Sequence, residues 1–150
     1  CGAFYSQGFS ASMEEAERQL KQCFSATLAL RDKYSETQSL SLTQEAQKYI
    51  KKHFCENDLS LGKVAGAIGV SSNYLSHMFS QKTGHTFIEY LTGLRMDQAK
   101  KLMKTTDLTS AEIGTKVGYS DAHYFYYIFK KTLDMTPKEY RNRVTEAEEP

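Results

Sequence analysis

Apolar residues recur along most of this chain at intervals of three and four positions, which is the period of a helix that buries one face. In the stretch HYFYYIFKK, residues 123–131, this period places Phe125, Ile128 and Phe129 together on one side. Apolar and polar residues do not alternate with a period of two for long, and only two prolines interrupt the chain. The pattern therefore predicts an all-α protein.

An amphipathic helix is expected over residues 12–34. Ser12 and Glu15 have the spacing of a capping box, which marks a helix start. Steps of three and four then alternate as in a heptad repeat, through Met13, Ala16, Leu20, Cys23, Thr27, Leu30 and Tyr34. We interpret this heptad seam either as a surface packed on the rest of the protein or on upstream structure, or as a homodimer interface.

A polar stretch follows this first helix. Residues 35–39 read SETQS and are predicted to form a linker. A further helix is expected over residues 43–54, with Ala46 and Ile50 on its apolar side.

The strongest internal signal is a repeat, with residues 110–140 resembling residues 61–90. Val64, Ile68, Gly69 and Ser71 correspond at an offset of 49 to Ile113, Val117, Gly118 and Ser120. After one inserted residue, the offset is 50, and Tyr74, Leu75, Phe79, Thr86 and Tyr90 correspond to Tyr124, Phe125, Phe129, Thr136 and Tyr140. Each copy has a short helix, a glycine where the backbone turns, and a second helix, which together predict a helix-turn-helix.

Capping residues mark the expected helix boundaries in both copies. They are Ser60 and the pair Thr109–Glu112 for the short helices, and Ser71 and Ser120 for the second helices. A linker helix over residues 87–106 would be roughly 30 Å long, close to the ~34 Å between successive major grooves on one face of DNA. The predicted fold is two helix-turn-helix units joined by a long linker helix and preceded by an extra N-terminal helix.

Charge is distributed unevenly along the chain, although the net charge is only +1. Residues 42–145 hold 15 Lys and Arg against 10 Asp and Glu, a net charge of +5. The remaining residues hold 4 against 8, a net charge of −4. Such asymmetry indicates a polyanionic partner for the C-terminal part.

Other classes of protein find little support in the sequence. The three cysteines are far apart and form neither a zinc pattern nor a disulfide framework, so a reducing cytoplasm is expected. No apolar run is long enough to cross a membrane, and no secretion leader opens the chain. HExxH motifs, glycine-rich phosphate loops and suggestive carboxylate pairs are missing, so we expect no enzyme, no metal and no cofactor.

The outward faces of the two second helices, expected over residues 72–82 and 121–131, carry an unusual set of side chains. At an offset of 50, Asn73, Ser76, His77 and Ser80 correspond to His123, Tyr126, Tyr127 and Lys130. Asn pairs with adenine, Ser serves either kind of base edge, and His donates to guanine. These faces are typical of recognition helices in the major groove of double-stranded DNA. The alternative is a protein-interaction module that binds its partner through the Tyr-rich face.

The repeated block resembles the DNA-binding domain of AraC/XylS-family bacterial transcription regulators. The resemblance is carried by LGKVAGAIGVSSNYLSHMFSQKTGHTFIEYLTGLRMDQAKKLM, residues 61–103, and EIGTKVGYSDAHYFYYIFKKTLDMTPKEYR, residues 112–141. It implies a seven-helix domain, here residues 42–145, that activates transcription by recruiting RNA polymerase. Residues 1–41 would be the tail of a missing sensor or dimerisation region, and residues 146–150 an acidic tail.

Carried over position by position, the resemblance implies two sets of DNA contacts. The base contacts would be Asn73, Ser76, His77, Ala122, His123, Tyr126 and Tyr127. The phosphate contacts would be Ser72, Ser80, Lys82, Lys130 and Lys131.

Two residues depart from the family pattern, and both lie in the second unit. Gly114 stands where the family has alanine, and glycine within a helix costs roughly 0.5–1 kcal/mol, so this short helix is expected to be loose. Asp134 stands where the family has a glycine after the recognition helix, and Asp tolerates a left-handed backbone less well. Both departures are therefore expected to weaken docking of the second helix-turn-helix.

Overall fold

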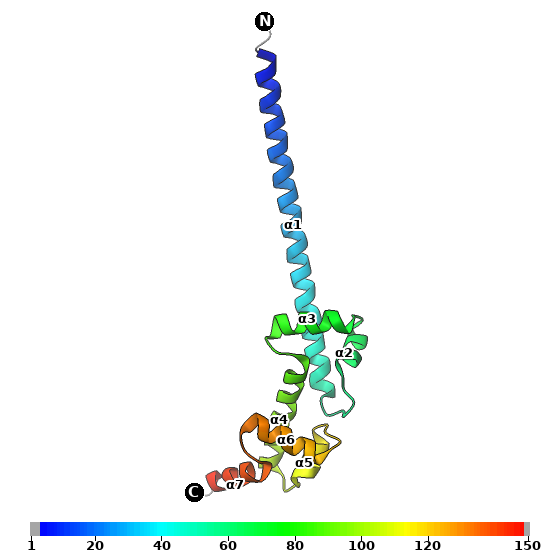
Figure 1. The fold of residues 1–150 in the computed structure, drawn as a ribbon, viewed down its shortest axis with the longest axis vertical. Coiled ribbons are helices and arrows are strands. Elements are labelled where there is room, and N and C mark those ends of the chain that lie inside the picture. The colour runs from blue at the N-terminus through cyan, green and yellow to red at the C-terminus, as the bar shows by residue number, and fades with distance from the viewer. Residues whose placement is uncertain (1–3, 149–150) are drawn as a thin grey trace. The chain divides into compact units, whose positions relative to one another are not determined.

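The computed structural model describes the backbone of residues 4–148 and the side chains of Met13 and residues 15–144. Over that range the chain forms only helices, as the sequence predicts (Figure 1). They are α1 (Phe4–His53), α2 (Leu61–Ile68), α3 (Ser72–Thr83), α4 (Phe87–Thr105), α5 (Ser110–Lys116), α6 (Ala122–Leu133) and α7 (Pro137–Glu148). Contacts within the chain divide it into two compact parts, residues 1–41 and 42–150. Residues 146–148 of the predicted acidic tail continue α7, and residues 149 and 150 lie outside the described part.

α1 begins earlier than the sequence predicts. Its backbone is helical from Phe4, so the predicted capping box of Ser12 and Glu15 does not mark the helix start. Residues 4–11 contain no proline that would prevent the helix from extending toward the N-terminus. The large apolar residues on and beside the heptad seam have exposed fractions between 63% and 73%: Met13, Leu20, Phe24, Leu30 and Tyr34.

The predicted linker over residues 35–39 is wrong, because this stretch is helical. Its polar side chains bond to the preceding turn instead of ending the helix: the Thr37 hydroxyl donates to the Lys33 carbonyl at 2.9 Å. Ser and Thr can remain inside a helix in this way when neither proline nor glycine interrupts it. The helix predicted over residues 43–54 is therefore the last part of α1.

Two separate hydrophobic cores hold residues 42–150 together. The first joins the end of α1 to α2, α3 and the start of α4, through Ala46, Ile50, Leu59, Val64, Ala65, Leu75, Met78, Phe79, Phe87 and Leu91. The second joins the rest of α4 to α5 and α6, through Met96, Ala99, Met103, Ile113, Val117, Tyr119, Phe125 and Phe129. α4 is thus the predicted linker helix, with α2 and α3 toward one end and α5 and α6 toward the other (Figure 1).

Local interactions set most of the short-helix boundaries where the sequence predicts them. The confirmed capping residues are Ser60 for α2, Ser71 for α3, and Thr109 with Glu112 for α5. Thr136 and Glu139 form a further capping pair at the start of α7. Gly69 and Gly118 have positive φ angles of 74° and 98°, as both turns require. Asp134 ends α6 with φ 54°, so it does adopt the left-handed conformation usually left to glycine.

The expectation that α5 is loose at Gly114 does not fit its surroundings. Gly114 is buried, and a Cβ placed there would lie 2.9 Å from Cγ of Phe125. At the corresponding places of the first unit stand Ala65 and Leu75, both fully buried. The second helix-turn-helix therefore pairs a smaller residue on α5 with a larger one on α6. Glycine makes room for the Phe125 ring.

Replacing Gly114 by alanine is expected to destabilise the protein. The extra methyl group overpacks against the base of a buried ring, which costs about 1–3 kcal/mol. This exceeds the gain in helix propensity of about 0.5–1 kcal/mol. Urea unfolding measures the difference.

Gly66→Ala is the matched control in α2, because no atom lies within 4 Å of a Cβ placed there. It should leave stability unchanged or raise it by about 0.5–1 kcal/mol. If Gly114→Ala stabilises the protein as much as Gly66→Ala does, Gly114 has no packing role.

Candidate nucleic-acid interface

The first group of predicted contact residues lies on the outer face of α3. Asn73, Ser76 and His77 are exposed, and Ser80 is partly exposed. Leu75, Met78 and Phe79 on the other side are buried in the first core and hold the helix in place. The outward residues line one shallow, open hollow together with Gln81.

The sequence prediction missed Gln81. Its position one helical turn beyond His77, and its correspondence with Lys131 at an offset of 50, were signals that could have identified it. An exposed glutamine at this place extends the row of hydrogen-bonding groups along α3.

The second group lies on the outer face of α6. Ala122 and His123 are exposed, and Tyr126 and Tyr127 are 45% and 57% exposed. Phe125 and Phe129 on the opposite side are buried, with Ile128 partly buried, so the predicted two-faced helix is confirmed. The side chains of Tyr126 and Tyr127 are thus not buried in the core and remain accessible to a partner.

The predicted phosphate contacts flank these two faces. Ser72 is exposed at the first position of α3, and Lys82 is partly exposed in its last turn. Lys130 and Lys131 are exposed on α6, where the Lys131 ammonium lies 6.0 Å from the centre of the Tyr127 ring. The face of a tyrosine ring attracts an ammonium group, so this contact places the positive charge beside the exposed aromatic side chains.

Asp121, and not the predicted Ser120, caps the N-terminus of α6. Its carboxylate accepts from the main-chain nitrogens of His123 at 2.7 Å and Tyr124 at 3.1 Å. The residue inserted into this turn relative to the first unit moves the cap one position along the chain. The hydrogen bonds from the Tyr124 and His123 main chain lower the pKa of Asp121.

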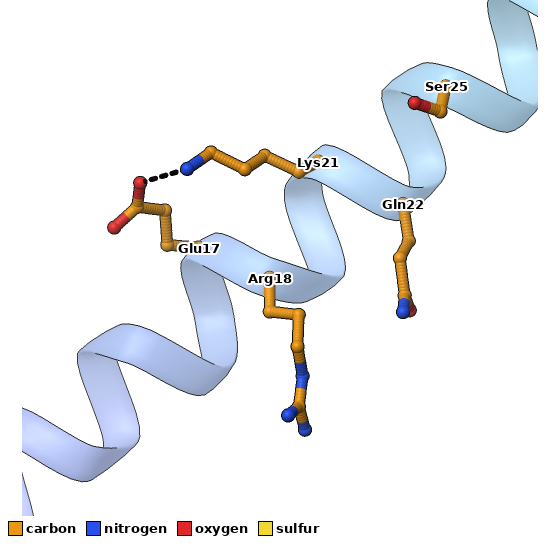
Figure 2. Close-up of a pocket in the computed structure, with 5 residues that line it drawn as sticks. All are labelled: Glu17, Arg18, Lys21, Gln22 and Ser25. Atoms are coloured by element: carbon orange, nitrogen blue, oxygen red, sulfur yellow. Dashed lines mark ion pairs between the residues drawn. The ribbon is translucent and has the colours of Figure 1, made fainter.

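A hollow on α1 carries no site. Figure 2 shows that its lining residues, Glu17, Arg18, Lys21, Gln22 and Ser25, all project from this one helix. All five are exposed, and Lys21 pairs with Glu17 at 2.6 Å. A surface formed by one side of a single helix cannot enclose a small-molecule ligand, and these residues are the polar face beside the heptad seam.

In the part of the chain that the structure describes, no three His, Cys, Asp or Glu side chains gather as a metal ion would require. Among the same residues, no helix is both long and apolar enough to cross a membrane.

Two copies of helix, turn and exposed polar helix define the class of helix-turn-helix proteins. A family model described as a helix-turn-helix domain matches residues 64–143. The xylose operon regulatory protein of Escherichia coli strain K12 is 35% identical over 98 residues, which are 65% of this chain and 25% of that protein. The chain belongs to the AraC/XylS family of transcription regulators, and it spans about a quarter of the length of this relative.

Solved structures agree with this assignment. The C-terminal domain of AraT, a response regulator from Geobacillus stearothermophilus, is 42% identical with a TM-score of 0.67, over 68% of this chain and 84% of that one. The DNA-binding domain of AdpA, solved with a target DNA, is 21% identical with a TM-score of 0.67, over 71% of this chain and 95% of that one, and it shows the shared fold. The predicted family and fold are confirmed, and so is the expectation that the chain is no enzyme, because the family consists of regulators.

The cap of α6 is expected to make stability depend on pH. Because folding lowers the pKa of Asp121, its ionised form stabilises the folded protein above the ordinary value of 3.8. This contribution is lost as the pH falls through the lowered pKa. Asn at this position still caps a helix but does not titrate. We therefore expect urea unfolding of Asp121→Asn to lose less stability than the wild type from about pH 5 downward.

Asp107→Asn serves as the control, because it removes the same charge from an exposed position outside any helix. It should keep the pH slope of the wild type. Identical slopes for Asp121→Asn and the wild type would show that the Asp121 carboxylate does not depend on this cap.

Proposed function

We propose that the chain binds double-stranded DNA in a sequence-specific manner and regulates transcription, with α3 and α6 entering adjacent major grooves. The observation that carries the proposal is the duplicated exposed face. Two helices, each anchored by buried apolar residues, present hydrogen-bonding side chains at corresponding positions. α4, with 19 residues, is about 28 Å long, which suits units placed roughly one turn of DNA apart.

The exposed side chains divide into two roles in this proposal. Base edges are read by Asn73, Ser76, His77, Ala122, His123, Tyr126 and Tyr127, to which we add Gln81. Phosphates are bound by Ser72, Ser80, Lys82, Lys130 and Lys131. The structure of AdpA with its target DNA, which has the same fold, supports this use of the domain.

The sign of regulation and the cellular setting belong to the same proposal. We take the protein to be a cytoplasmic activator that contacts RNA polymerase when it is bound beside a promoter. Transcription in vitro distinguishes activation from repression when the promoter carries the selected site, which is the DNA sequence that the protein selects from a random library.

Binding to DNA is tested first with a labelled random-sequence duplex, by fluorescence anisotropy at about 50 and 200 mM salt. If several phosphates are engaged, affinity should fall about 10- to 1,000-fold between these salt concentrations. In a selected site, His77→Ala should cost about 1–3 kcal/mol and relax the preference at one base pair. Lys131→Ala should weaken binding to all duplexes alike and flatten the salt dependence.

Two matched variants control for these changes. His85→Ala removes an exposed imidazole outside the α3 face, and Lys33→Ala removes a lysine from α1. Both should bind as the wild type does. A changed sequence preference in Lys131→Ala would contradict its assignment as a phosphate contact. Absence of binding at either salt concentration would point the tyrosine face of α6 toward a protein partner.

The heptad seam of α1 is proposed to pair with the seam of a second copy. Alternating steps of three and four are the signature of a coiled coil, and the large apolar residues on it are exposed. Ala16, Cys23 and Thr27 contribute little apolar surface, so we expect weak association. Sedimentation equilibrium should show dimers that form only at high protein concentration. Lysine at both Leu20 and Leu30 should abolish them.

The control variant places lysine at Gln22 and Ser25, on the polar face of the same helix (Figure 2). It adds the same charge and should dimerise as the wild type does. A wild type that stays monomeric throughout, or a seam variant that dimerises equally well, would reject the coiled-coil proposal.

A further inference from the structure

Arg95 lies on α4 between the residues of the two hydrophobic cores. Leu91, one turn earlier, belongs to the first core, and Met96 belongs to the second. Arg95 is nonetheless only 8% exposed. A charge is costly to bury, so a side chain in this position must be held by specific partners.

Those partners come from the loop that leads into the first helix-turn-helix. The Arg95 Nε donates to the main-chain carbonyl of Phe54 at 2.8 Å, and Nη2 donates to that of Glu56 at 2.7 Å. This loop follows directly after α1, whose last turns carry Ala46 and Ile50 of the first core. One planar guanidinium thus fixes two carbonyls of a short loop at once, as a fork of donors can.

The same guanidinium also meets the turn of the second helix-turn-helix. Its Cζ lies 5.0 Å from the centre of the Tyr119 ring, and Tyr119 is buried in the second core. A Cβ placed on Gly118 would lie 2.8 Å from Arg95 Nη2 and 2.9 Å from the carbonyl oxygens of Phe54 and Cys55. The turn between α5 and α6 is therefore pressed against the loop between α1 and α2, with Arg95 between them.

We propose that Arg95 is a positioning residue that fixes the two helix-turn-helix units at one angle, so that the protein accepts only one spacing between its two half-sites. The proposal rests on the proposed binding of α3 and α6 to one DNA site. α4 alone is a single helix between two separate cores, and a single helix leaves the units free to twist about it. The contacts of Arg95 close a second connection between the units and remove that freedom.

The spacing of the half-sites measures this angle directly. One added base pair moves the second half-site by about 3.4 Å and turns it by about 35°. A rigid protein can then engage only one unit, and it loses the base contacts of the other. For the selected site with one base pair inserted, we expect the wild type to lose affinity about 30-fold or more.

Arg95→Lys keeps the positive charge but lacks the fork that holds both carbonyls. Its affinity for the original site should fall, and the penalty for the inserted base pair should shrink to about 5-fold or less. Arg141→Lys is the matched control, because Arg141 also donates to a main-chain carbonyl, that of Leu108, a residue packed against the second core. It should keep the penalty of the wild type.

Each outcome decides between the alternatives. An unchanged spacing penalty in folded Arg95→Lys, which means an equal loss of affinity for both spacings, overturns the proposal. If circular dichroism shows that Arg95→Lys is unfolded, Tyr119→Phe replaces it, since this variant removes only the hydroxyl that interacts with Thr92 and Arg95. Its penalty must then fall below that of the wild type. A wild type that tolerates the insertion overturns this inference alone, whereas one that selects no sequence overturns the proposed function as well.

Discussion

The burial of one face of each short helix against the two ends of α4 is the constraint on which the rest of residues 42–150 depends. Helices of 7 to 12 residues, such as α2, α3, α5 and α6, are marginal in water on their own. They exist here because Phe79 in one unit, and Phe125 and Phe129 in the other, are almost completely buried. The same burial decides which side chains remain outside. Anchoring and display are therefore two consequences of one packing arrangement.

The two units reach this arrangement with different volumes. In the second unit a glycine faces Phe125, whereas the corresponding residues in the first are Ala65 and Leu75. A large residue on α6 is tolerated only when the residue that faces it on α5 is small, since interiors are close-packed. Gly114 and Phe125 must therefore be regarded as one feature. Considered alone, Gly114 looks like a defect in α5, which is the interpretation that the structure corrects.

How much could be predicted from the sequence follows from the range of each interaction. Ser60, Gly69 and the pair Thr109–Glu112 act within a few residues of themselves, and their roles were predicted. The choice of Asp121 over Ser120 was not, because both are good caps and one inserted residue decides between them. The helical state of residues 35–39 was not predicted either, because their polar composition is typical of a linker, although no proline or glycine interrupts the helix there.

Arg95 shows why the rest could not be predicted. In the sequence it is an arginine on a long helix, which is most often solvent-exposed. Its partners are the main-chain carbonyls of residues 54 and 56, and a carbonyl has no sequence signature. The glycine that lets the second turn approach, Gly118, was identified only for its φ angle. Its second role, leaving room for Arg95, depends on three segments that meet only in the folded chain.

The two outward faces differ in chemistry, and this difference bears on how they would share the reading of one DNA site. The face on α3 carries hydrogen-bonding groups and no lysine or arginine: Asn73, Ser76, His77, Ser80 and Gln81. The face on α6 has two tyrosines and two lysines at matching positions. Base edges are distinguished by hydrogen-bonding patterns, whereas phosphates attract any positive charge. If the chain binds DNA as proposed, α3 would supply more of the discrimination between sequences and α6 more of the salt-dependent affinity. Such a division needs both helices on the DNA at once, because an affinity contributed by α6 serves the selectivity of α3 only if the angle between the units is fixed.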